Sequence, residues 1–163
     1  MRRALTILIA AMLFAAPALA ADEATTANLD ILRDTIRANR KALVAVNLTL
    51  TDAEAAQFWP LYDRYQAELK AVNDRLVKII SEYTDNYSKL DDARAGKLAT
   101  DYLAAEEDRA RIRRAYFPDF LKILPGKKAA RFYQIENKMD AVVRYELAGA
   151  IPVVDEASAP PAK

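Results

Sequence analysis

Residues 50–90 read LTDAEAAQFWPLYDRYQAELKAVNDRLVKIISEYTDNYSKL, and this stretch decides the fold. Apolar and aromatic residues recur along it at alternating spacings of four and three residues. Such a spacing gathers them into one stripe on one side of a helix, with a period close to that of a coiled coil. The stripe comprises Phe58, Tyr62, Tyr65, Leu69, Val72, Leu76, Ile79, Tyr83, Tyr87 and Leu90. No period-two alternation typical of a strand extends over this length, so we expect a long helix that contributes to the core.

The start of this helix is marked by Leu50, Thr51 and Glu54. Thr51 can cap the first turn, and Glu54 can reach back to the Thr51 amide, which together make a capping box. Leu50 precedes the cap and can pack onto the first turns. The pair Trp59-Pro60 follows, and because proline removes a helical hydrogen bond and restricts the residue before it, we expect a kink or a restart there.

Residues 1–20 are typical of a secretory signal peptide. Arg2 and Arg3 precede an apolar run, and Ala18-Leu19-Ala20 matches a cleavage site. The run is short for a membrane span, although an uncleaved anchor is the alternative. We therefore predict cleavage after Ala20, a periplasmic location and no stable membrane insertion of the mature chain.

Composition excludes several classes of function. The 163 residues contain no cysteine and no histidine, which removes thiol redox chemistry, the usual transition-metal ligands and the commonest general base. Loss of Arg2 and Arg3 from 24 basic residues leaves 22 against 23 acidic residues, which argues against a nucleic-acid partner. No phosphate-binding loop, dinucleotide motif or catalytic triad can be drawn. We therefore expect no enzyme, metal or cofactor, and we interpret Glu106-Glu107-Asp108 and the pair Glu136 and Asp140 as solvated helix faces.

Three further helices are predicted, over residues 28–46, 93–116 and 127–148, with Asp91-Asp92 as an N-cap and Gly149 as a stop. Phe117-Pro118 echoes Trp59-Pro60, and the apolar face continues to Leu124 before Pro125-Gly126 breaks the chain. We expect a signal peptide at 1–20, one helical domain at 21–149 and a flexible tail at 150–163, although Ile151, Val153 and Val154 could dock.

The predicted architecture is all-α. The second and third helices form a long, kinked antiparallel hairpin, flanked by the other two. A hairpin of this length leaves part of each apolar stripe uncovered in a single chain. We therefore expect a homodimer with coiled-coil character.

Charge is segregated towards the C-terminal half. Residues 91–108 contain six acidic and two basic residues, whereas residues 109–131 contain eight basic residues and Asp119 alone. One interpretation is that the charges complement helix dipoles. Another is a basic surface for acidic or unfolded partners, and a nucleic-acid surface is the third. The residues assigned to a protein-binding surface are Arg109, Arg113, Tyr116, Lys127, Lys128 and Arg131.

The chain resembles the Spy/CpxP-type periplasmic proteins, whose signature is Leu-Thr-x-x-Gln, usually present twice. The first copy corresponds to Leu50-Thr51-Asp52-Ala53-Glu54, with glutamate in place of glutamine. The second falls at Leu124-Pro125-Gly126-Lys127-Lys128, where only the position matches. The segments 58–62 and 130–136 also resemble a branch of exported helical proteins.

This resemblance implies a cradle-shaped antiparallel dimer that binds unfolded or stress-related envelope proteins without ATP. We therefore expect a periplasmic chaperone-like protein or envelope-stress adaptor. The alternative is a structural scaffold of the envelope with one fixed partner, and an enzyme is a remote third possibility.

Overall fold

The computed structural model describes residues 38–154, and within this range the fold is all-α, as predicted. Residues 38–47 are helical and are followed by α2 (Asp52–Asn86), a short 3-10 turn η1 (Tyr87–Lys89), α3 (Asp92–Ile123) and α4 (Gly126–Ala150). The predicted signal peptide and residues 28–37 of the predicted first helix lie outside the described residues. No helix within 38–154 combines the length and the apolar character that crossing a membrane requires.

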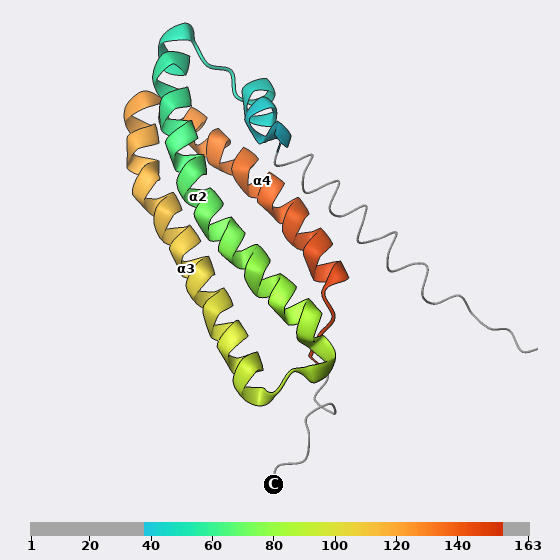
Figure 1. The fold of residues 1–163 in the computed structure, drawn as a ribbon. Coiled ribbons are helices and arrows are strands. Elements are labelled where there is room, and N and C mark those ends of the chain that lie inside the picture. The colour runs from blue at the N-terminus through green and yellow to red at the C-terminus, as the bar shows by residue number, and fades with distance from the viewer. Residues whose placement is uncertain (1–37, 155–163) are drawn as a thin grey trace, which may run out of the picture.

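α2 and α3 lie side by side and antiparallel, joined by the short connection at η1 (Figure 1). α4 runs back along this pair after the sharp turn at Leu124-Pro125. The helical residues 38–47 pack at the end of the molecule where α2 begins and α4 follows α3. The hairpin predicted from the sequence is thus present, while the dimer stays a prediction.

The capping box at the start of α2 is confirmed. The Glu54 amide donates to the Thr51 hydroxyl at 3.3 Å, and the Thr51 amide donates to the Glu54 carboxylate at 2.8 Å. These two bonds satisfy amides that the first turn of a helix otherwise leaves without partners. The predicted cap at the start of α3 is also present, because the Asp91 carboxylate accepts from the Arg94 amide.

Replacing Thr51 with alanine should lower the free energy of unfolding by about 0.5–2 kcal/mol, because it removes the side-chain half of the capping box. Urea denaturation of the parent and the variant measures the change. Thr49→Ala is the matched control, since Thr49 is an exposed threonine two residues before the cap. Equal midpoints for all three proteins would show that the cap does not stabilise α2.

Two prolines lie inside helices, and neither ends its helix. α2 continues through Pro60, so the expected restart is wrong, and a bend at Pro60 stays a prediction. α3 continues through Pro118 to Ile123, beyond its predicted end at Tyr116. Proline costs about 3 kcal/mol in a helix interior. Here Phe58 and Phe120, each two residues from a proline, are buried in the core, and their packing offsets that cost.

α4 continues through Gly149, so the predicted stop at this glycine is also wrong. Gly149 lacks the positive φ of a C-terminal glycine cap. The helix ends at Ala150. Its C-cap is Ile151, whose amide donates to the Leu147 carbonyl at 3.0 Å and whose own backbone is extended, with ψ at 117°. Ile151 precedes Pro152, and a residue before proline avoids helical geometry. Proline therefore ends α4 where glycine was expected to.

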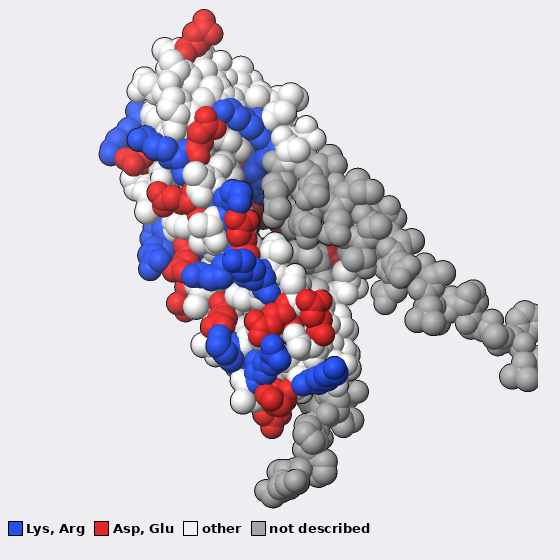
Figure 2. All heavy atoms as spheres, in the orientation of Figure 1, with Lys and Arg blue, Asp and Glu red and all other residues white. Residues whose placement is uncertain are grey.

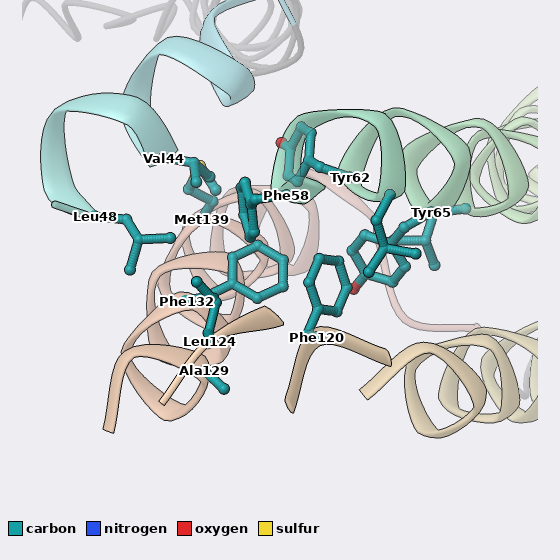
Figure 3. Packing of buried hydrophobic residues seen from close by; sticks show 12 residues of the cluster. Val44, Leu48, Phe58, Tyr62, Tyr65, Phe120, Leu124, Ala129, Phe132 and Met139 are labelled. Carbon is teal, nitrogen blue, oxygen red and sulfur yellow. The ribbon is translucent and has the colours of Figure 1, made fainter. Parts of the chain in front are cut away.

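The core has two parts along the length of the hairpin. The larger part lies at the end where α2 begins and draws on residues 44 and 48 as well as on α2, α3 and α4. Its centre is aromatic, and Figure 3 shows Phe58, Phe120 and Phe132 pointing toward one another. The Phe120 and Phe132 ring centroids are 4.6 Å apart. A smaller, aliphatic part lies between α2 and α3 near η1 and includes Val72, Leu76 and Leu98.

Candidate functional site

The six residues assigned to one cationic surface do not come together. Arg109 and Arg113 lie on α3 and face α4, whereas Tyr116 on α3 faces α2. Lys127, Lys128 and Arg131 belong to the first turns of α4. On the face in Figure 2, basic and acidic side chains alternate along the molecule instead of forming one basic area.

Most of these residues already hold other parts of the protein. The Tyr116 hydroxyl donates to the Glu68 carboxylate at 2.5 Å, and Lys128 pairs with Glu54 of the capping box at 2.6 Å. Arg131 Nε donates to the Asn47 carbonyl at 2.7 Å, which ties α4 to the residues before α2. Lys127 is exposed. Tyr116, Lys128 and Arg131 therefore each stabilise a contact between separate segments of the fold. The sequence does not reveal these contacts.

Arg109 and Arg113 meet on a buried carboxylate of α4. Asp140 is 5% exposed, and it accepts from Arg109 at 2.8 Å and also from Arg113. Arg40 from the first described helix reaches the same carboxylate at 2.5 Å and the Glu136 carboxylate at 2.6 Å. Two helices thus supply three arginines to two acids of α4, one turn apart. We call Arg40, Arg109, Arg113, Glu136 and Asp140 the buried charge network.

The environment acts in opposite directions on the two acids. Burial of Glu136, which is 0% exposed, raises its pKa above the usual value, although Arg40 and a hydrogen bond from Gln66 at 3.1 Å oppose that rise. At Asp140 burial also favours the neutral acid, but the surrounding guanidinium groups outweigh it and lower the pKa. A carboxylate that faces three arginines stays charged in a buried site.

The interpretation of Glu136 and Asp140 as a solvated face is therefore wrong. A signal was present in the sequence, because both acids fall on the apolar stripe that runs from Phe132 to Val143 at helical spacing. The cluster at 106–108 is only partly solvated. Glu106 pairs with Arg144 at 2.5 Å, Asp108 pairs with Arg75 and Arg111, and Glu107 is exposed.

The titration of Glu136 makes a testable prediction. A carboxyl whose folded pKa is raised contributes stability that is full below its unfolded pKa, 4.5, and is lost as the pH rises through the folded pKa. Glu136→Gln removes that titration. The unfolding free energy of the parent minus that of the variant should therefore fall as the pH rises from 4.5 towards neutrality. Urea midpoints of both proteins across this range measure it.

Asp140 does not confuse that measurement, because its lowered pKa places its titration below 3.8. Tyr62, whose hydroxyl lies 3.5 Å from Glu136, has a pKa raised by burial and stays protonated throughout. If the unfolding free energies of the parent and of Glu136→Gln differ by the same amount over the whole pH range, that result would contradict a raised pKa at Glu136.

An open groove of about 840 Å³ lies between α3 and α4, directly beside the buried charge network. Phe117 and Tyr133 supply aromatic surface, with ring centroids 5.4 Å apart, and the Arg113 guanidinium lies 5.5 Å from the Tyr133 ring centroid. Polar and charged residues line most of the remainder, together with Ala110, Pro118 and Ala130. The lining residues are Glu106, Arg109, Ala110, Arg113, Arg114, Phe117, Pro118, Ala130, Tyr133, Gln134, Asn137 and Arg144.

The groove contains four arginines and one glutamate, so its surface is positively charged. Arg109 and Arg113 are held against Asp140, and the exposed Arg144 pairs with Glu106, whereas Arg114 is exposed on α3. The sequence predicted Arg109 and Arg113 but missed Arg114, Arg144, Phe117 and Tyr133. Arg114 and Phe117 were within the basic, aromatic segment that the sequence did single out. Tyr133 and Arg144 carry no such signal, since their place depends on how α4 packs.

No group of three or more metal-ligating residues occurs within residues 38–154. The chain was compared with protein-family models, with curated proteins and with solved structures, and none of them matches it.

Proposed function

We propose that this chain is an exported, ATP-independent chaperone-like or stress-adaptor protein that holds unfolded polypeptide in the α3–α4 groove. The observation that supports it best is the groove itself, where aromatic rings and exposed guanidinium groups stand side by side. The partners would be unfolded or stress-related proteins of the envelope, as the resemblance to the Spy/CpxP-type proteins implies.

The shape of the groove favours an extended chain over a small molecule. Sites for small ligands bury most of the ligand surface. This groove is open along its length and offers contacts on two sides only, from α3 and α4. An extended polypeptide can lie in it and still expose the part that has yet to fold.

The chemistry of the groove suits segments of mixed character. Arg114 and Arg144 would attract acidic segments at long range, an effect that salt screens over about 8 Å at physiological ionic strength. Phe117 and Tyr133 would then contact apolar and aromatic side chains at short range. Such contacts are weak one by one, so a client leaves once it buries its own apolar surface, and no nucleotide is needed.

The buried charge network supports this function indirectly. Asp140 fixes Arg109 and Arg113 against α4, so the wall of the groove is rigid where the cations are paired. Arg114, the next residue along α3, is exposed and is free of that role. The capture surface predicted from the sequence is thus reassigned, with Arg114 and Arg144 as the contacting cations.

Charge reversal at Arg114 should slow capture of an acidic unfolded client by about twofold to tenfold at low salt and flatten its salt dependence. The readout is light scattering during client aggregation, with and without the mature protein, at low and high salt. Circular dichroism checks that Arg114→Glu keeps the helical content of the parent.

Arg111→Glu is the matched control. Arg111 lies on the same helix, is exposed and pairs with Asp108 outside the groove, so the change in net charge is the same. Equal protection by the two variants would show that only net charge matters. Protection of a single protein and of no other client would favour the scaffold alternative.

A further inference from the structure

The chain beyond α4 docks on the far end of α2. Ile151 has an extended backbone, and the chain after it runs beside the last turns of α2, at the end of the hairpin opposite the aromatic core (Figure 1). The Tyr83 hydroxyl donates to the Pro152 carbonyl and the Tyr87 hydroxyl donates to the Val153 carbonyl, both at 2.7 Å. Part of the predicted flexible tail is therefore held in place.

Tyr83 and Tyr87 form an aromatic pair. They stand four residues apart, one helical turn, and their ring centroids are 5.7 Å apart with the planes at 73°. This edge-to-face contact orients both rings, so that their hydroxyl groups meet two consecutive carbonyls.

Both hydrogen bonds of the pair go to the main chain of the tail, and the residues that accept them are exposed. The Val153 residue is 87% exposed, and Pro152 and Val154 are exposed as well. Any extended polypeptide offers carbonyl groups at the same spacing, because the repeat of an extended backbone does not depend on its side chains. A contact of this kind does not discriminate between sequences.

We propose that Tyr83 and Tyr87 form a second polypeptide-binding site, which grips the main chain of an extended segment. The chain's own residues 152–153 are its resident occupant, and a client held in the α3–α4 groove displaces them. Only the displacement step rests on the proposed function. The evidence for the site and for its occupant is the two hydrogen bonds from Tyr83 and Tyr87.

The strength of the two hydrogen bonds and the effective concentration of the tethered tail decide which ligand can displace it. Each net hydrogen bond shifts an equilibrium by about twofold to tenfold, so two of them keep a tethered tail mostly docked. The tail begins one residue after α4, and a tether this short gives an effective concentration in the millimolar range. A free peptide at micromolar concentration cannot displace it. A client anchored in the groove has an effective concentration comparable to that of the tail, so it can displace the tail. The site therefore selects long unfolded chains over short peptides.

The test uses the full chain with one nitroxide label on the tail. The parent contains no cysteine, so Ser158→Cys provides a single attachment point. A docked tail should broaden the amide NMR signals of residues 83–90. Tyr83→Phe with Tyr87→Phe removes only the two hydroxyl groups and should abolish the broadening. Tyr102→Phe with Tyr145→Phe, two exposed tyrosines outside this contact, is the matched control and should leave it unchanged.

Two ligands then test displacement. A peptide of residues 150–156 should relieve the broadening only in the millimolar range, whereas an unfolded client should relieve it at micromolar concentration. Broadening that survives the double phenylalanine change, or that persists with a client cross-linked in the groove, overturns the proposal. A client that does not cross-link in the groove contradicts the proposed function instead, and the tyrosine and peptide arms still decide whether the second site exists.

Discussion

Asp140→Asn should destabilise the protein by about 3–5 kcal/mol, because it removes one partner of a buried ion-pair network and leaves the others charged. Asparagine keeps the volume of aspartate, so the change isolates charge from packing. Arg40, Arg109 and Arg113 all contact this carboxylate in the parent. Without it, Glu136 would be left to balance Arg40, and Arg109 would keep, among residues 38–154, only its 3.8 Å contact with Glu106.

The measurement is the free energy of unfolding from urea denaturation. Whole domains are stable by about 5–15 kcal/mol, so a loss of this size would be a large share of the total. Asp101→Asn is the control, since Asp101 pairs with Lys97 on the exposed face of α3 and such pairs contribute little. A loss at Asp140 no larger than the loss at Asp101 would contradict the account of a network that fixes α4.

Phe132→Ala should cost about 3–5 kcal/mol, since it leaves a cavity in the centre of the aromatic core. Phe132 is fully buried, and its ring contacts those of Phe58 and Phe120 at centroid distances of 5.2 Å and 4.6 Å. Tyr62 and Tyr65 also lie against it. The ring joins α2, α3 and α4, so no single neighbour can close the gap.

Thermal and urea denaturation of the variant measure the effect. Tyr145→Ala is the control, because Tyr145 is an exposed aromatic residue of the same helix and its removal creates no cavity. A small loss at Phe132 would mean that the core repacks around the missing ring. The packing that holds α2, α3 and α4 together would then depend on other residues.

The helices were predictable where the pattern is local. The spacing of the stripe in residues 50–90 depends only on the period of a helix, and the capping box at Thr51 depends only on the adjacent turn. Both are present in the structure. Seven residues of the stripe are buried from Phe58 to Ile79, while Tyr83 and Tyr87 further along it are half-buried and hold the tail.

The helix ends were less predictable, since they depend on tertiary contacts. Pro118 favours a break on local grounds, and the burial of Phe120 two residues later outweighs that preference. Gly149 favours a stop, but the helix continues to Ala150, where the restriction that Pro152 places on Ile151 ends it.

The site was the least predictable part. Arg109 interrupts the apolar stripe of α3, and this position is consistent with its burial, but the carboxylate that it needs lies thirty-one residues away on another helix. Basic residues that are close in sequence point to different neighbours around their helices. Arg131 faces Asn47, and Tyr116 faces Glu68. A count of charges along the chain therefore predicted a basic segment correctly and a single basic surface incorrectly.

Site-specific photo-cross-linking in the α3–α4 groove tests the central claim most directly. A photoreactive residue at Asn137 lies in the groove, and one at Lys138 lies on the other side of α4, toward Leu43 and Asn47. With an unfolded envelope protein and no nucleotide, the account predicts cross-links from position 137 that disappear when the client has folded, and few from position 138. Equal cross-linking at the two positions, or none at 137, would contradict it.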